Sequence, residues 1–366
     1  MRWRKNSLLL TCLLLCLIGS AAAETFKPIR TIDLKSELCE PKFQQENIPM
    51  AGVAFVTDDD VLVYTVCHVN VALSLRGRFQ ETDPYHLKAV IVDASTGAIK
   101  KRFDLPTHSH ESAILITHEG NLLIHRDNLL ELFDPEGKRL AASRIDRTGL
   151  YVFIEVSATS HILNLVDFTD TFDGKPNAVT ILDSRNLSVI SQWHDDADSM
   201  SIASSPEITV RTVASGSILV MRTFTDTQWT TLLKEAPSGI QRPIFVSDSE
   251  FAVPVLSQGA VLVFKASGKV LASLKSPSSI ATAVSRDGHM LGVVWGGNHI
   301  FVGPDGHLTV PQTGARLFEL PSLNEVGSLS FSPTPMPGFR FALSPHSKRL
   351  AILDQLNLSI METPVK

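Results

Sequence analysis

Residues 283–295 read AVSRDGHMLGVVW, and residues 342–354 read ALSPHSKRLAILD. Each stretch has a short apolar run that ends in serine, a polar turn and a second apolar run, a pattern typical of a β-hairpin. The serine hydroxyl can accept a hydrogen bond from the backbone two residues on and so close the turn. The same pattern recurs along the chain, with the hydroxyls of Thr57, Thr117, Ser157, Ser215, Ser247, Ser285 and Ser344.

A second kind of hairpin follows each of the first, and it turns near Gly or Asn, which readily adopt the positive φ that a short turn needs. Its copies are Val90–Asp93 with Gly97, Leu132–Asp134 with Gly137, Ile181–Asp183 with Asn186, Leu232–Leu233 with Gly239, Val263–Phe264 with Gly268, and Leu317–Phe318 with Asn324. Two hairpins make a four-stranded unit, and the hydroxyls recur at a mean spacing of about 48 residues, which matches the period of propeller blades. The sequence therefore predicts an all-β fold, a single β-propeller with seven four-stranded blades.

The seventh unit is one strand short, because its last strand begins at Leu358-Ser359-Ile360 and the chain ends at Lys366. We expect Phe26 to Leu34 to supply the missing outer strand and to close the ring, since no other unit uses this segment. Asn298 to Val310 forms an extra hairpin in the sixth unit. We interpret it as an insertion, with an eighth blade as the alternative.

The two stretches quoted first resemble the S-P-D-G-K-x-L hairpin of the WD40-like, YVTN-like and quinoprotein-like β-propeller superfamily. Val92-Asp93-Ala94-Ser95-Thr96-Gly97 with Phe103 is similar to a quinoprotein repeat, and the whole chain resembles uncharacterised exported bacterial propellers. The resemblance implies an architecture, and this architecture hosts unrelated functions. No Trp-Asp dipeptide occurs. A quinone-dependent dehydrogenase would repeat the quinoprotein pattern in every blade and add a Ca²⁺ site, so we expect no cofactor.

The first 23 residues have the organisation of a signal peptide. Arg2, Arg4 and Lys5 precede an apolar run of 11 residues from Leu8 to Ile18, and the small residues Ala21 and Ala23 follow. This run is shorter than the roughly 20 residues that a membrane-spanning helix needs. The sequence thus predicts a signal peptide over 1–23, a propeller domain over 24–366 without a membrane span, and export to the periplasm or the extracellular space.

Composition narrows the class of protein further. With 44% hydrophobic and 19% charged residues, the chain is too apolar to be disordered. Without the leader, 30 basic and 38 acidic residues give a formal charge of −8, which argues against nucleic acid as a partner. Only Cys39 and Cys67 remain, and in an oxidising compartment two such thiols favour one disulfide. Two unpaired buried thiols are the alternative.

Metal chemistry has few candidate residues. His108, His110, His118 and His125 fall within 18 residues of one another, yet the predicted strands allow only His108, His110 and Glu111 to act together. We favour a solvated loop over a metal site for this group. Asp58-Asp59-Asp60 is interpreted as a solvated turn, because Asp is favoured in turns. The sequence predicts no metal site.

Long connections are expected on one face of the ring. In a four-stranded blade, the connections between blades and those between the second and third strands emerge on the same face, here called the long-loop face. The opposite, short-turn face has tight turns such as 58–60, 118–121 and 286–288. Long loops on a rigid scaffold are the usual carriers of binding. The candidate ligand-binding residues assigned to the long-loop face are Arg76, Arg78, His86, His108, His110, Asp195, Asp196, Arg222, Asp226 and Trp295.

Two classes of function fit these features. The first is an exported, non-catalytic propeller, expected to be a monomer, that binds a protein, peptide or glycan on the long-loop face. The second is a hydrolase or lyase of the lactonase type, with its site at the central channel. The first is favoured because no acid/base pair and no ligand cluster stands out in the sequence.

Overall fold

The structure is a computed structural model, which describes residues 24–25, 28–39, 51–67, 71–73, 79–81, 85–109, 111–145, 151–168, 176–195, 201–214, 216–224, 226, 228–236, 239–275, 279–295, 301–302, 308–309, 314–331 and 340–363. The predicted signal peptide, residues 1–23, lies outside the described residues. In the described part of the chain, no helix is long and apolar enough to cross a membrane.

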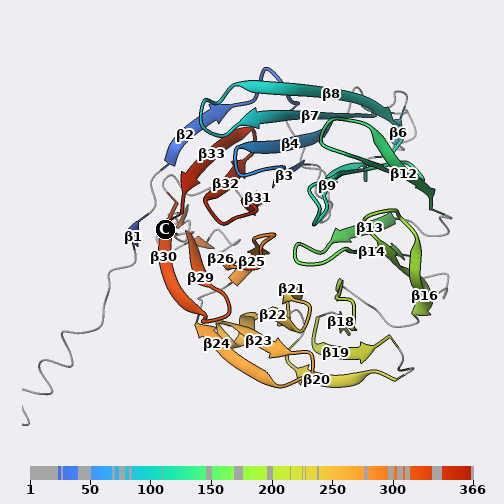
Figure 1. The fold of residues 1–366 in the computed structure, drawn as a ribbon, viewed down its shortest axis with the longest axis vertical. Helices are drawn as coiled ribbons and strands as arrows, with labels where there is room; N and C mark the ends of the chain where they lie inside the picture. Colours follow the sequence, from blue (N-terminus) through green and yellow to red (C-terminus); the bar gives the residue numbers. More distant parts are fainter. Residues whose placement is uncertain are drawn as a thin grey trace, which may run out of the picture.

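The strands form a closed ring of seven four-stranded blades around a central axis (Figure 1). Every blade is antiparallel, and its first strand is the one nearest the axis. Blades one to three are β3 (Ala51–Phe55), β4 (Asp60–Cys67), β7 (Tyr85–Asp93) and β8 (Ile99–Thr107); β9 (Ala113–Ile116), β10 (Leu122–Arg126), β11 (Leu129–Phe133) and β12 (Arg139–Arg144); and β13 (Tyr151–Val156), β14 (Ile162–Phe168), β15 (Asn177–Asp183) and β16 (Val189–Asp195).

Blades four to six follow in chain order, and blade seven takes its outer strand from the N-terminal part of the chain. Their strands are β17 (Ser201–Ser204), β18 (Ile208–Val213), β19 (Ile218–Thr223) and β20 (Thr230–Lys234); β21 (Ile244–Ser247), β22 (Glu250–Val255), β23 (Ala260–Lys265) and β24 (Val270–Lys275); β25 (Ser279–Val284), β26 (Met290–Trp295), β29 (Gly314–Glu319) and β30 (Asn324–Ser330); and β31 (Arg340–Leu343), β32 (Arg349–Asp354), β33 (Asn357–Glu362) and β2 (Pro28–Asp33). The predicted seven-bladed propeller is confirmed.

The hydrophobic core lies in the seams between adjacent blades. Each of the seven seams contains its own cluster of buried apolar side chains. The strand β4 shows how one segment serves two seams: Val61 and Val63 pack toward blade seven, whereas Leu62 and Tyr64 pack toward blade two. Because successive side chains of a strand point to opposite faces, a strand between two seams must be apolar throughout.

The outer strands alternate instead, because one of their faces meets water. Along β8, from Ile99 to Thr107, partly buried and exposed residues alternate almost without a break. The sequence pattern therefore differs between inner and outer strands of the same blade, and it changes with the number of faces that each strand buries.

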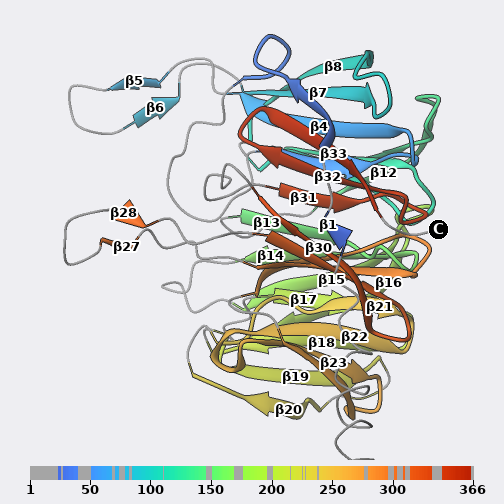
Figure 2. The same ribbon diagram turned by 90° about the vertical axis from the view of Figure 1, so that its left-hand side faces the viewer.

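Two small hairpins project from the long-loop face (Figure 2). One pairs β5 (Val71–Leu73) with β6 (Phe79–Glu81), and the other pairs β27 (Phe301–Val302) with β28 (Leu308–Thr309). The second hairpin lies between β26 and β29, which pair directly with each other. The extra hairpin at 298–310 is thus an insertion within blade six, as interpreted from the sequence.

Blade four differs from the predicted register. The first turn of this blade is closed by Ser205, whose hydroxyl accepts hydrogen bonds from the backbone of Glu207 and Ile208, and not by Ser215. Residue 215 falls between β18 and β19, and Leu232-Leu233 belongs to the outer strand β20. The prediction failed because Ser205 and Ser215 are both flanked by short apolar runs, so local turn chemistry did not distinguish them.

The N-terminal segment closes the ring as predicted. The strand β2 pairs antiparallel with β33, with Thr31 opposite Ser359 and Ile32 opposite Leu358. Directly before it, β1 (Glu24–Thr25) pairs parallel with β30 of blade six. The segment therefore connects the outer edges of blades six and seven before the chain enters blade one.

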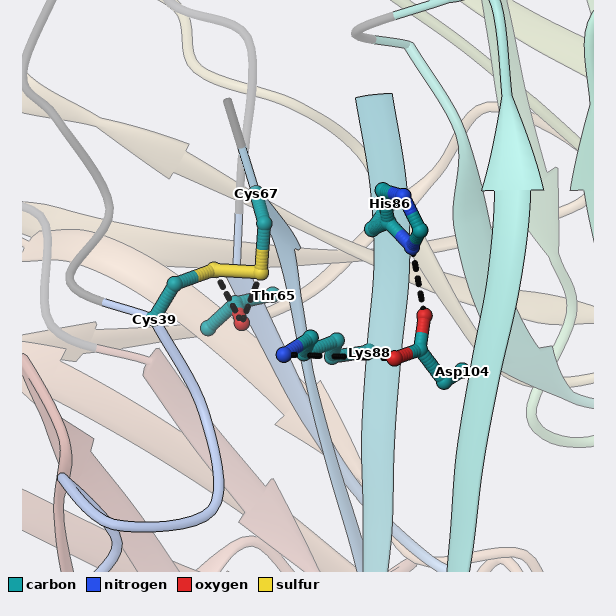
Figure 3. Close-up of a disulfide and its surroundings, with 6 residues drawn as sticks. All are labelled: Cys39, Thr65, Cys67, His86, Lys88 and Asp104. Carbon is teal, nitrogen blue, oxygen red and sulfur yellow. Dashed lines mark hydrogen bonds and ion pairs between the residues drawn. A yellow bond between two sulfur atoms is a disulfide. The ribbon is translucent and has the colours of Figure 1, made fainter. Parts of the chain in front are cut away.

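A disulfide links this segment to blade one (Figure 3). The Cα atoms of Cys39 and Cys67 are 5.7 Å apart, within the usual range for a bridge. The buried hydroxyl of Thr65 lies 3.3 Å from the sulfur of Cys39 and 3.9 Å from that of Cys67. Because disulfide sulfurs have no proton, Thr65 is the donor. The predicted disulfide is present, and it spans the seam at which the ring closes.

The acidic turn at Asp58-Asp59-Asp60 is also part of this seam, in contrast to the solvated turn expected from the sequence. Asp58 accepts a hydrogen bond from the backbone of His346 at 3.0 Å and lies 3.3 Å from the Nζ atom of Lys348, and Asp59 pairs with Arg349. Although burial opposes it, hydrogen bonding by His346 lowers the pKa of Asp58. Blades one and seven are therefore joined by charged groups on the short-turn face.

Candidate functional site

The tight turns of the short-turn face interlock with one another. Arg286, in the first turn of blade six, donates hydrogen bonds to the carbonyl oxygens of Phe55 and Val56 in blade one. A Cβ atom at Gly120 of blade two would lie only 2.7 Å from Nη1 of Arg286. This one side chain therefore links blade six to blades one and two on the short-turn face. Burial lowers the pKa of Arg286, with Asp58 and Glu119 acting in the opposite direction.

An ion pair connects blades three and five. Arg242, which precedes β21 of blade five, places Nη2 2.8 Å from Oε2 of Glu155 on β13 of blade three. The same guanidinium lies 4.5 Å from the ring centre of Phe153. Burial raises the pKa of Glu155, although the charge of Arg242 acts against this shift. The pair therefore connects two blades, three and five, that are not neighbours in the ring.

The connection from blade one to blade two is held by a hydrogen-bond network. Glu111 is buried and accepts a hydrogen bond of 3.0 Å from the backbone of Val152. Asp127 accepts one of 2.7 Å from the backbone of His108, and the buried ring of His125 contacts the carbonyl oxygens of Glu111 and Asp127. These polar groups fix the link between blades. Glu111 thus has a structural contact, and His110 lies outside the described residues.

The structure places the predicted site residues on different blades. His86 lies at the long-loop end of β7 and contacts Asp104 at 2.6 Å, as Figure 3 shows. Asp195 ends β16 opposite Asn177, and Trp295 ends β26, with its ring against Gly314. None of His86, His108 and Trp295 contacts another of the three in the described structure. Arg76, Arg78, His110 and Asp196 lie outside the described residues.

Arg222 and Asp226 are not on the long-loop face, and that assignment was wrong. Because the register of blade four differs, Arg222 lies near the end of β19, and Asp226 lies in the connection from β19 to β20. This connection emerges on the short-turn face. Asp226 accepts a hydrogen bond of 2.7 Å from the hydroxyl of Thr223.

Sequence reasoning missed several charged residues that the fold buries. Glu155 lies in the strand YVFIEV and Arg211 in the strand ITVRTV, and each is the one charged residue of its strand. Both are at least nine-tenths buried. A charged residue in an otherwise apolar strand was the available signal, because a buried charge needs a partner or a function.

No group of three or more His, Cys, Asp or Glu side chains suited to a metal ion occurs within the described ranges. The described structure instead offers the Glu155–Arg242 pair. The pKa of its carboxyl group is raised, and beside the guanidinium this pair can exchange a proton or bind a polar group. No second carboxylate among the described residues forms an ion pair with Arg242.

No protein-family model matches the chain, and no curated protein matches it. Its structure is similar to a chain in the crystal structure of the mitotic checkpoint complex, with a TM-score of 0.54 and 12% identity over 94% of this chain and 97% of that one. It is also similar to the C-terminal WD40 domain of Sif2, with a TM-score of 0.49 and 10% identity over 94% of this chain and 99% of that one. At such identities the likeness concerns the fold. The chain has the fold of a WD40-like β-propeller.

Proposed function

We propose that the protein is a non-catalytic binding or scaffold propeller that engages a protein or peptide on its long-loop face. The contrast between the two faces carries this proposal. On the short-turn face, the turn at Arg286 is occupied by contacts with blades one and two, and Asp58 and Asp59 are occupied by contacts with blade seven. The long-loop face carries the β5–β6 and β27–β28 hairpins, which project away from the ring (Figure 2).

The proposal is tested with peptides selected from a random display library on the purified protein. We expect their binding to be lost in the variants Arg76→Glu, His108→Ala and Asp196→Lys, which change the long-loop face. Glu136→Lys and Lys269→Glu are matched controls in exposed turns of the short-turn face, and they should leave binding unchanged. Loss of binding in the controls alone would show that the wrong face was chosen. If the protein binds glycans but no peptide is selected, the partner is a glycan and not a protein or peptide.

The alternative is an enzyme of the lactonase type, and Glu155 is the observation that favours it. A buried carboxyl group with a raised pKa is the kind of group that general acid catalysis uses. Metal analysis of the purified protein distinguishes the two functions. Stoichiometric Ca²⁺ or Zn²⁺, together with lactone hydrolysis that Glu155→Gln abolishes, would replace the binding proposal by the enzymatic one.

We also propose that the protein is exported as a monomer after cleavage behind Ala23. The basic and apolar regions of residues 1–23 support this proposal, and so does the disulfide, which persists in oxidising compartments. N-terminal sequencing of the exported protein should begin at Glu24, and light scattering should give the mass of one chain. Recovery of the intact chain from Met1 onward in membranes would contradict the cleavage.

A further inference from the structure

Two tryptophans and two arginines alternate in a stack in the seam between blades three and four. The guanidinium carbon of Arg222 lies 4.2 Å from the ring centre of Trp193 and 4.6 Å from that of Trp229. On Trp229, the guanidinium carbon of Arg211 lies 3.9 Å from the ring centre. Arg222 is therefore held between two indole rings, and each of its contacts is within the range of cation–π attraction.

Strand alternation explains why these residues meet. On β18 and β19, Val210 and Met221 pack toward blade five, so Arg211 and Arg222 point to the opposite face, toward blade three. On β16, Trp193 lies opposite Val179, which packs in the seam toward blade four. The two blades are neighbours at the lower right of Figure 1. The stack therefore lies within the seam between blades three and four, and it is not part of the long-loop face.

The stack concentrates positive charge in a half-buried place. Burial lowers the pKa of Arg222, and burial together with the nearby Arg222 charge lowers the pKa of Arg211 to about 10. Both side chains therefore keep their charge at neutral pH. None of the described carboxylates forms an ion pair with Arg222, and the nearest acidic residue along the chain, Asp226, accepts its hydrogen bond from Thr223.

Two buried donors in the stack lack an acceptor. Nε of Arg222 and Nε1 of Trp193 have no hydrogen-bond partner among the described residues. Buried polar groups are nearly always paired, so orphaned groups require an explanation. Both orphans are donors, and the positive charge of Arg222 is not paired with any described carboxylate. This combination favours an acceptor with a negative charge.

We propose that the in-plane edge of Arg222, held between Trp193 and Trp229, binds the carboxylate of a small-molecule ligand. Both indole rings lie within cation–π range of the guanidinium, and its Nε donor, which lies in the guanidinium plane, has no acceptor among the described residues. In that plane the fork of N–H donors matches the two oxygens of a carboxylate. The site lies away from the long-loop face, and it is independent of the binding function proposed above.

The probe is citrate, with sodium chloride at matched ionic strength as the reference. Two of the three tryptophans after residue 23 belong to the stack, so indole fluorescence reports on the site, and calorimetry gives the affinity. We expect saturable binding of one citrate per chain. Arg222→Lys keeps a positive charge but lacks the fork, and it should weaken binding about 10- to 100-fold. Arg139→Met removes an exposed arginine of blade two and should leave binding unchanged.

Other outcomes would overturn the proposal. Equal effects of chloride and citrate would show charge screening only. Citrate binding of equal strength in Arg222→Lys and the unchanged protein would place the anion elsewhere. Saturation by a hexaglutamate peptide but not by citrate would overturn the small-molecule assignment. If no anion binds and Arg222→Met is less stable than the unchanged protein, the stack serves only to pack the seam. Thermal unfolding of each variant shows whether the ring is intact, so loss of binding is not confused with loss of fold.

Discussion

Glu155 is 9% exposed and pairs with Arg242, so this buried acidic residue links blades three and five. Burial raises the pKa of Glu155 above its ordinary value of 4.5. The folded protein therefore binds a proton that the unfolded chain releases in the pH range between the two values. By linkage, folding stability falls as the pH rises through this range.

The first prediction concerns the pH dependence of stability. The variant Glu155→Gln removes the titrating group. As the pH rises above about 4.5, the unchanged protein should therefore lose stability relative to the variant, and the difference between their free energies of unfolding should change in favour of the variant. Urea unfolding at several pH values measures this difference. Glu136→Gln, a change in an exposed turn, is the control and should follow the unchanged protein. Parallel curves for Glu155→Gln and the unchanged protein would show that the raised pKa is wrong.

At the scale of elements, the N-terminal strap, residues 24–39, determines how the ring is closed. The strand β2 completes blade seven, and Leu34 behind it is fully buried in the seam with blade one. Arg102 on β8 makes a two-pronged contact with Glu37, at 2.7 and 2.9 Å. The strap therefore connects blades six, seven and one.

The second prediction tests the packing of this strap. Leu34→Ala removes a fully buried side chain and should lower the free energy of unfolding by about 2–5 kcal/mol. Ile29→Ala, in the same strap but 44% exposed, should have a much smaller effect. Deletion of residues 24–36 should expose the edge of blade seven and cause aggregation. An unchanged melting temperature after the deletion would contradict closure by β2.

The third prediction concerns the disulfide. It closes a loop with a sequence separation of 28, so Cys39→Ser/Cys67→Ser should lower the free energy of unfolding by about 2–4 kcal/mol. Urea unfolding with and without reductant measures this loss. Reductant should bring the unchanged protein to the stability of the variant and have no effect on the variant itself. If reductant does not alter the unchanged protein, the bridge does not stabilise the ring.

At the scale of the whole molecule, stability is distributed over seven separate seams. The cluster between blades one and two shares no residue with the cluster between blades five and six. Each seam is a face-to-face contact of two twisted sheets, so a defect in one seam reaches another only around the ring. In the part of the chain that the structure describes, the buried apolar side chains form these seven seam clusters and not one central core.

The fourth prediction follows from this arrangement. Leu62→Ala and Leu291→Ala lie in different seams, and each should lower the free energy of unfolding by about 2–5 kcal/mol. Their effects should add to within about 0.5 kcal/mol in the double variant. Val61→Ala and Leu358→Ala share one seam and should depart from additivity. A large coupling between Leu62 and Leu291 would contradict independent seams.

Blade number and ring closure were predictable from the sequence because they depend on periodic features. A strand between two seams is apolar throughout, an outer strand alternates, and each turn needs Ser, Gly or Asn at a fixed place. The seventh unit lacked an outer strand after the one at Leu358, and no other unit used the segment from Phe26 to Leu34. The sequence therefore predicted that this segment closes the ring. In blade four the same reasoning failed, because similar turn patterns occur at Ser205 and Ser215, only ten residues apart. As a result, the candidate residues Arg222 and Asp226 were placed on the wrong face.

Sequence alone thus determined the blades, their number and the strand that closes them, since local patterns record which faces of each strand are buried. Only the tertiary structure decided which side chains meet. Arg286 contacts Phe55, Arg242 contacts Glu155, and Arg222 stacks between Trp193 and Trp229. These contacts depend on the angle between neighbouring blades and on closure of the ring. Neither is a property of a single strand, so residues far apart along the chain form the sites, and no local pattern shows which they will be.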